Sequence, residues 1–328
     1  MAGPVAASEI TVSTIRLDRV LQYEPRDLTI SVEAGMLYSD LSRILESHRQ
    51  MIPLDPPFAH DATIGGVLSA NHSGPRRRMY GTARDMVIGM TFATLQGKLV
   101  QTGGMVVKNV AGLDMGKLII GSFGTLAALA TVNFRVYPIP PGTRTFVRAF
   151  ADVDEAMAAR DASLTSALQP SAIDIQKTAN GYKLLLQASG SVQVLDRFSR
   201  EYSGGRTLEG SEEANLWDTI REMTPSFLAK NPEGAMVRIP CKLSEVGRVL
   251  ERLPAPAIAR AGSGVVYGHF TEAREAVGKG LIEFAPKSLR EENQLWPAPG
   301  TDFEMMKKIK LMFDPESLLN RGRLYGRI

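Results

Sequence analysis

The chain places 12 of its 30 glycines between residues 61 and 130, a stretch of about a fifth of its 328 residues. Glycine has no Cβ atom, so such a cluster marks backbone with positive φ or backbone that another group approaches closely. The stretch contains the segments Ala-Thr-Ile-Gly-Gly (62–66) and Asn-His-Ser-Gly (71–74). These residue types favour either backbone N–H groups that approach a large ligand or a glycine-rich hairpin with an Asx turn.

Composition bounds the class of protein. The formal charge is +3, from 38 basic and 35 acidic residues, so no strong positive field exists to collect nucleic acid. One cysteine cannot form an internal disulfide, and no apolar run approaches the roughly 20 residues that a membrane span requires. The N-terminus also lacks the pattern of a signal peptide. These features predict a cytoplasmic protein of about two domains, at roughly 150 residues per domain, without a membrane span.

Periodicity predicts an α+β fold. In the first part we expect a strand at 28–32, an amphipathic helix at 37–48, and a hairpin in which strands 85–95 and 98–102 meet at a turn containing Gly97. Prolines 138, 140 and 141 then predict a domain boundary. Beyond them, strands and helices alternate, and Asp152 is the expected N-cap of a helix over 153–168.

Several common sites are missing from the sequence. No strand is followed by a G-x-G-x-x-G that opens a helix, and no P-loop motif occurs. The four histidines do not have the spacing of metal ligands, and no serine or cysteine lies in a nucleophile motif. We therefore predict no metal site and name no catalytic residue.

Ordered motifs supply a resemblance. The chain contains P-L-D-P-P (53–57), A-T-I-G-G (62–66), N-H-S-G-P (71–75), Y-G-T-A-R-D (80–85), K-N-V-A-G-L-D (108–114) and G-S-F-G-T-L (121–126), and ends with F-D-P (313–315) and L-N-R-G-R (319–323). This order resembles the PCMH-type FAD-binding domain of the vanillyl-alcohol oxidase and p-cresol methylhydroxylase superfamily. Within that superfamily, it is most similar to the FAD-binding subunits of bacterial three-subunit glycolate oxidases.

The resemblance implies a set of flavin contacts, in which glycines let the backbone lie beside the ring and ribityl chain. The contacts carried over by position are Pro53, Asp55, Ala62, Thr63, Ile64, Gly65, Gly66, Asn71, Ser73, Gly74, Tyr80, Gly81, Asp85, Gly124, Ala128 and Leu129. The run Arg76-Arg77-Arg78 is interpreted as a solvated surface or partner contact, with flavin phosphate as the alternative.

The family also has an earlier R-G-x-G-T-like loop that holds the FAD pyrophosphate and carries the usual attachment histidine. This sequence begins downstream of that loop, so we expect an N-terminally shortened FAD domain and non-covalent FAD with a weakened phosphate grip. The domains implied are an FAD domain at 1–142, an α+β cap domain at 143–302, and a segment at 303–328 that packs back on the FAD domain.

The function implied is that of one subunit of a hetero-oligomeric glycolate dehydrogenase, which oxidises glycolate, a 2-hydroxy acid, to glyoxylate. Hydride would pass to flavin N5, and electrons would pass to an iron–sulfur partner beside a sister flavin subunit. Such a complex would be cytoplasmic, or peripheral to the inner membrane through its partners. Two alternatives remain: a non-catalytic assembly subunit that no longer binds FAD, and a stand-alone FAD-linked D-lactate or alditol oxidase.

Overall fold

The computed structural model describes residues 10–72, 74–105, 114–292, 295–326 and 328. The chain divides into two compact units. The five-stranded unit comprises Ala2–Ser73, Gly81–Ile139 and Gln294–Ile328, and the eight-stranded unit comprises Gly74–Tyr80 and Pro140–Asn293. The chain therefore passes between the units more than once. The short segment Gly74–Tyr80 belongs to a different unit from the residues on either side of it in the sequence.

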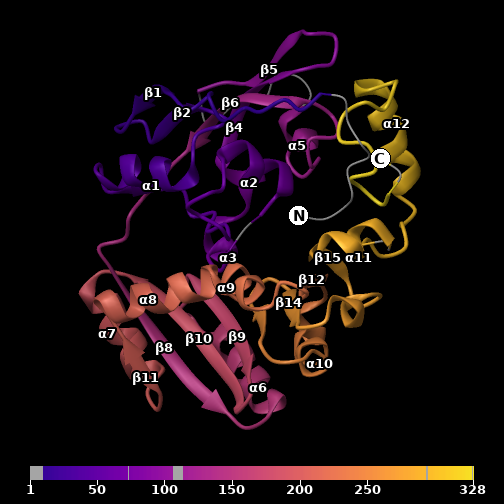
Figure 1. The fold of residues 1–328 in the computed structure, drawn as a ribbon. Coiled ribbons are helices and arrows are strands. Elements are labelled where there is room, and N and C mark those ends of the chain that lie inside the picture. Colours follow the sequence, from indigo (N-terminus) through magenta and orange to yellow (C-terminus); the bar gives the residue numbers. More distant parts are fainter. Residues whose placement is uncertain (1–9, 73, 106–113, 293–294, 327) are drawn as a thin grey trace. The chain divides into compact units, whose positions relative to one another are not determined.

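The five-stranded unit is built on an antiparallel sheet of order β1-β2-β6-β4-β5 (Figure 1). Its strands are β1 (Val20–Glu24), β2 (Thr29–Glu33), β4 (Val87–Ala93), β5 (Leu99–Gly103) and β6 (Ala128–Arg135), and β3 (Gln50–Met51) pairs separately with β7 (Tyr137–Pro138). Its helices are α1 (Tyr38–Glu46), α2 (Ile64–Ala70), α4 (Ala83–Met86), α5 (Gly116–Ile119) and α12 (Phe303–Phe313).

The predicted hairpin forms, with Gly97 at φ +74° between β4 and β5. The expectation of a strand from residue 85 is wrong, because residues 83–86 form α4 instead. Asp85 accepts hydrogen bonds from the backbone N–H and hydroxyl of Thr82, at 2.8 and 3.0 Å, which completes a capping box. The predicted helix at 37–48 corresponds to α1.

The eight-stranded unit contains an antiparallel sheet of order β11-β8-β10-β9-β13-β14-β12-β15 (Figure 1). The strands are β8 (Gly142–Phe150), β9 (Ala172–Thr178), β10 (Gly181–Gly190), β11 (Arg206–Leu208), β12 (Ala235–Pro240), β13 (Ala257–Arg260), β14 (Val265–Phe270) and β15 (Leu281–Phe284). The helices are α3 (Arg77–Tyr80), α6 (Val153–Thr165), α7 (Val192–Glu201), α8 (Gly210–Arg221), α9 (Met223–Lys230), α10 (Val246–Glu251) and α11 (Lys287–Glu292).

Alternation along the strands places apolar side chains on both faces of this sheet. Val147 packs in the cluster that contains Trp217 and Ile220 of α8, whereas the preceding residue, Phe146, stacks against Phe198 of α7 with ring centroids 6.4 Å apart. Helix α8 and helix α7 therefore cover opposite faces. Asp152 caps α6 as predicted, since its carboxylate accepts a hydrogen bond from the backbone N–H of Glu155.

A buried carboxylate ties α8 to the sheet. Glu213 is 3% exposed and accepts hydrogen bonds from the hydroxyls of Thr143 and Thr145, at 2.7 and 2.8 Å, and from the amide of Gln187 at 3.2 Å. Trp217 Nε1 donates to Thr145 Oγ1 at 2.8 Å. These bonds satisfy a charge that would otherwise be costly to bury. No helix in the described ranges is long and apolar enough to cross a membrane.

Candidate functional site

The first turn of α2 is hydrogen-bonded to the residues that follow β2. The backbone N–H of Ile64 donates to Met36 O at 2.8 Å, and that of Gly65 donates to Ala34 O at 2.6 Å. Thr63 is the N-cap of α2, and its hydroxyl accepts a hydrogen bond from the N–H of Gly66 at 3.1 Å. The Thr-Ile-Gly-Gly segment therefore forms the N-cap and first turn of a helix, not a hairpin.

A Cβ atom would meet different neighbours at the two glycines of this segment. A Cβ atom on Gly65 would lie 3.0 Å from Ala34 O and 3.3 Å from Ala34 Cβ, so it would be crowded by the residue that follows β2. A Cβ atom on Gly66 would meet only Thr63 Oγ1, at 3.1 Å, among the described residues. Gly65 is therefore restricted by the residue that follows β2, whereas among the described residues Gly66 is restricted only by the N-cap hydroxyl of its own helix.

The far end of α2 contacts a second loop, residues 121–125. The helix ends at Asn71, whose φ of +51° is left-handed. The N–H groups of Gly121 and Phe123 donate to Leu68 O and Ser69 O, at 3.0 and 2.9 Å. A Cβ atom on Gly121 would lie 3.4 Å from Asn71 Cβ, so the loop is in close contact with the C-cap. At 1.5 Å per residue, about 10 Å separates the two ends of α2.

Two buried polar atoms at this junction have no hydrogen-bond partner among the residues that the structure describes. They are Asn71 Oδ1 and Ser122 Oγ, and Ser122 is 5% exposed. A buried polar atom without a partner is unfavourable by about 1–3 kcal/mol, so such atoms call for a ligand or an ordered water. Flavin carries an N3–H group and ribityl hydroxyls that can donate to the amide oxygen, and carbonyl and ring nitrogen atoms that can accept from the serine hydroxyl. The junction of α2 with the 121–125 loop therefore fits the FAD implied by the sequence resemblance.

The predicted contacts Pro53 and Asp55 lie in a turn that α1 supports. The hydroxyl of Tyr38 donates to Ile52 O at 2.6 Å and accepts from the N–H of Asp55 at 3.4 Å. Asp55 has a φ of +48°, and Pro53 is buried. The turn is therefore held in its conformation by a buried tyrosine from a different element.

Other predicted contacts have structural roles of their own. The φ of Gly81 is +84°, and a Cβ atom there would lie 2.5 Å from the Asp85 carboxylate, which is already engaged in capping α4. Ala128 and Leu129 begin β6, paired with Ala93 and Phe92 of β4.

Two predicted contacts belong to the other unit, and a third is outside the described residues. Gly74 and Tyr80 belong to the segment grouped with the eight-stranded unit, and Ser73 lies outside the described residues. In the same segment, Arg78 bonds to Gln169 and packs on Gly262, so this member of the arginine run contacts the rest of its own unit.

The eight-stranded sheet contains buried charges that the sequence pattern did not single out. Asp174 on β9 is fully buried and forms an ion pair with Arg260 on β13, whose guanidinium lies 5.5 Å from the ring centroid of Tyr267 on β14. Burial raises the pKa of Tyr267, chiefly by disfavouring the phenolate. Only strand order, which local sequence does not reveal, brings these residues together.

His269 on β14 is buried between hydrogen-bond partners. Its Nε2 lies 2.9 Å from Thr224 Oγ1, and its Nδ1 lies 3.2 Å from Pro256 O. Burial, assisted by the charge of Arg260, lowers the pKa of His269 to about 4, against the opposing hydrogen bond to Pro256 O. The imidazole is therefore neutral at physiological pH. Within the ranges that the structure describes, no three His, Cys, Asp or Glu side chains are grouped to hold a metal ion.

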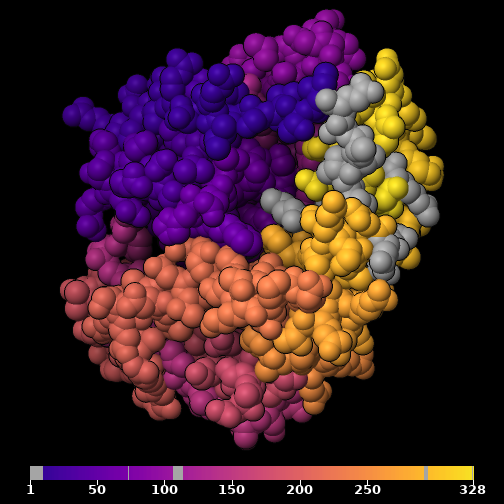
Figure 2. Space-filling view, in the orientation of Figure 1, coloured from indigo at the N-terminus to yellow at the C-terminus, as the bar shows by residue number. Residues whose placement is uncertain are grey.

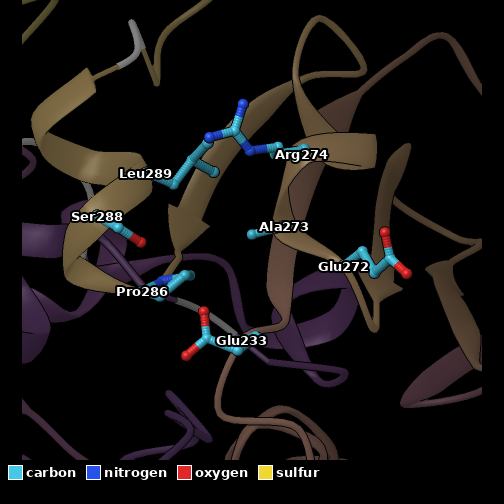
Figure 3. Close-up of a pocket in the computed structure, with 7 residues that line it drawn as sticks. All are labelled: Glu233, Glu272, Ala273, Arg274, Pro286, Ser288 and Leu289. Atoms are coloured by element: carbon cyan, nitrogen blue, oxygen red, sulfur yellow. The ribbon is translucent and has the colours of Figure 1, made fainter.

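A separate pocket of about 190 Å³ lies in the eight-stranded unit and contains none of the predicted flavin contacts (Figure 3). It is lined by Glu233, Glu272, Ala273, Arg274, Pro286, Ser288 and Leu289. The carboxylates of Glu233 and Glu272 do not point toward one another, and both side chains are exposed. Because water screens such groups, they do not form a desolvated site for a cation or a reaction.

Comparison with known proteins identifies the family. Residues 1–103 match the family model of an FAD binding domain. The chain is 30% identical to glycolate oxidase subunit GlcE of Escherichia coli (strain K12), over 100% of this chain and 90% of the relative. It is 24% identical to glycolate oxidase subunit GlcD of Bacillus subtilis (strain 168), over 95% of this chain and 78% of the relative.

The fold is also found among solved structures. An alkyldihydroxyacetonephosphate synthase superposes with a TM-score of 0.67 at 17% identity, covering 93% of this chain and 65% of the other. This chain thus spans less than two thirds of that protein, and the likeness shows the fold. With an FAD-binding match that includes α2 and a GlcE relative aligned along the whole chain, the protein belongs to the family of FAD-linked oxidoreductases that contains the glycolate oxidase subunits.

Proposed function

We propose that this protein is the FAD-binding subunit of a complex that oxidises glycolate to glyoxylate and passes electrons to an iron–sulfur partner. The observation that carries the proposal is the alignment with GlcE over the full chain, since GlcE is itself named as a subunit of glycolate oxidase. The second named subunit, GlcD, is also similar, which supports a complex that contains two related flavin subunits. Any attachment to the inner membrane would be through the partners.

Five positions around α2 are proposed to hold the cofactor. Gly66 lets the flavin approach the first turn of α2 with no side chain between them, while Thr63 fixes the conformation of that turn. At the other end, Asn71 Oδ1 and Ser122 Oγ hydrogen-bond polar atoms of the flavin. Because Gly124 has no Cβ atom, the Asn320 amide can approach the 121–125 loop. When bound, FAD supplies the acceptor for the hydride that leaves the hydroxyl-bearing carbon.

The protein contributes orientation and exclusion of water at this junction. Ser122 is buried, so its hydrogen bond to the cofactor would be made without competition from solvent. The hydrogen bonds from Gly121 and Phe123 to α2 hold Ser122 at a fixed position relative to Asn71. A hydrogen-bonding pair of this kind fixes the orientation of a planar ligand.

The first test is the visible spectrum of the full-length chain, purified alone and after co-expression with its sister flavin and iron–sulfur subunits. The proposal predicts a flavin band near about 450 nm in the chain itself. It also predicts glycolate-dependent reduction of an artificial acceptor by the complex, but not by the isolated chain.

Each other outcome points to a specific alternative. A folded, colourless chain that takes up no added FAD would identify an assembly subunit without a cofactor. Turnover of D-lactate or an alditol by the isolated chain would identify a stand-alone oxidase. Either result overturns the proposal.

A further inference from the structure

The C-terminal segment contacts the 121–125 loop through a buried ammonium group. Lys310 on α12 is 3% exposed, and its Nζ donates to Thr125 O at 2.7 Å, Leu319 O at 3.0 Å and Asp314 Oδ2 at 2.5 Å. A lysine ammonium has three N–H donors, so all three are used. Lys310 thus connects the loop to α12 and to the turn that follows it.

The turn after α12 is fixed from within. Asp314 is fully buried, and it accepts hydrogen bonds from the N–H groups of Leu318 and Leu319, at 2.9 and 2.7 Å. With Lys310, these bonds fix the backbone that leads directly to residue 320. Asn320 is therefore presented from a rigid support and not from a loose chain end.

Asn320 bonds to two consecutive carbonyls of the 121–125 loop. Its Nδ2 donates to Phe123 O at 3.0 Å and to Gly124 O at 3.1 Å. Both loop residues have positive φ, +54° at Phe123 and +70° at Gly124, and a Cβ atom on Gly124 would lie 2.5 Å from the Asn320 amide. A phenylalanine in the left-handed region is strained, so this conformation persists only where surrounding contacts impose it.

Phe123, the strained residue, directly follows Ser122, whose buried hydroxyl has no partner among the described residues. Ser122 lies between Gly121 and Phe123, both of which are bonded to α2, and its Oγ and Asn71 Oδ1 lack partners among the described residues. The edge of Trp296 also packs against Phe123, with ring centroids 5.8 Å apart. Asn320 supplies the side-chain hydrogen bonds that fix the direction of the two carbonyls.

We propose that Asn320, supported by the Lys310–Asp314 pair, is a positioning residue that holds the 121–125 loop in the conformation that binds flavin. This inference rests on the proposed FAD site at Asn71 and Ser122. Without the Asn320 amide, the loop would populate other conformations. The apparent affinity for FAD would then fall in proportion to the fraction of molecules still in the binding conformation.

The test compares FAD dissociation constants of full-length variants, measured by quenching of flavin fluorescence on addition of apoprotein. Asn320→Gly removes both donors but accepts the positive φ of residue 320, which is +45°. Asn320→Asp keeps the side-chain shape without the donors. The matched control is Arg321→Ala, because Arg321 is exposed and bonds only locally to Ser317 O.

We expect the dissociation constant to rise about ten-fold or more in both Asn320 variants, equivalent to about 1.4 kcal/mol, and to stay unchanged in Arg321→Ala. The melting temperature of the Asn320→Gly apoprotein should stay close to that of the parent apoprotein. Amide hydrogen exchange at residues 121–125 should be faster in the Asn320→Gly apoprotein than in the parent apoprotein.

Equal FAD affinity in the Asn320 variants and the parent would overturn the inference and leave the proposed function standing. A fall in affinity matched by an equal loss of apoprotein stability would also overturn it, since that would be a purely structural effect. A parent chain that binds no FAD would instead overturn the proposed function.

Discussion

Lys310 and Asp314, one helical turn apart at the end of α12, form an ion pair of 2.5 Å whose side chains are 4% and 0% exposed. Burial alone would raise the pKa of Asp314. Hydrogen bonds from Lys310 and from the N–H groups of Leu318 and Leu319 outweigh that effect, and the pKa is lowered overall. The C-terminal segment, coloured yellow, reaches the surface in Figure 2. On α12, Met305 and Met312 are exposed, whereas Lys310 is buried.

Removal of one partner from this pair should be strongly destabilising. Lys310→Met leaves a buried carboxylate without its cation and frees Thr125 O and Leu319 O, so we expect the free energy of unfolding to fall by about 3–5 kcal/mol. The measurement is urea denaturation of the purified chain. The matched control is Lys307→Met on the same helix, which removes an exposed ion pair with Glu304 and should reduce stability by less than about 1 kcal/mol. Equal effects of the two variants would contradict the prediction.

His269 should make stability depend on pH. Its pKa in the folded protein, about 4, lies below the ordinary value of 6.5, so between these values the unfolded chain binds the proton and the folded chain does not. The stabilising contribution is therefore complete above about pH 6.5 and is lost progressively as the pH falls toward 4, by at most about 3 kcal/mol.

This dependence can be measured as the difference in free energy of unfolding between pH 7.5 and pH 5. His269→Gln should reduce that difference, because glutamine keeps polar groups for Thr224 but does not titrate. An identical pH dependence in the variant and the parent would show that another group is responsible.

Local sequence patterns predicted elements that depend on neighbours in the chain. The Asp152 cap and the hairpin at Gly97 are determined within a few residues, and both predictions are confirmed. Asp85 shows the limit of such reasoning. Its place before an apolar run indicated a strand, whereas its contact with Thr82 makes it a capping residue of α4. Its role as a flavin contact, which the resemblance implies, stays a prediction.

Long-range contacts account for what the sequence could not predict. In the sequence, nothing distinguishes Lys310 from the other lysines of its amphipathic helix. Its hydrogen-bond partner Thr125 O is 185 residues away in the chain. The role of Gly65 likewise depends on Ala34 of a different element. By contrast, the resemblance predicts a flavin contact at Asn71, and the structure shows there a buried oxygen without a partner among the described residues, which gives this prediction a physical reason.

The two neighbouring glycines at the start of α2 should respond differently to substitution. Gly65→Ala places a methyl group 3.0 Å from Ala34 O, so we expect a lower melting temperature of the apoprotein. Gly66→Val places a branched side chain where the flavin is proposed to approach α2, so it should abolish FAD binding while the circular dichroism spectrum stays close to that of the parent. FAD occupancy is read from the ratio of flavin to protein absorbance. Equal FAD occupancy in Gly66→Val and the parent would remove Gly66 from the site.

Ser122→Ala separates a ligand-binding hydroxyl from a structural one. In the apoprotein Ser122 Oγ is buried without a hydrogen-bond partner among the described residues, so its removal should leave the free energy of unfolding unchanged or raise it by up to about 1 kcal/mol. If the hydroxyl bonds to flavin, the same variant should weaken FAD binding about five- to ten-fold, since one hydrogen bond contributes roughly 1 kcal/mol. The control is Thr125→Val, whose hydroxyl already donates to Ser122 O at 2.7 Å and whose loss should therefore lower apoprotein stability. Only a ligand can make a side chain that is dispensable for folding important for binding, so opposite signs for stability and affinity in Ser122→Ala would place the flavin at this loop.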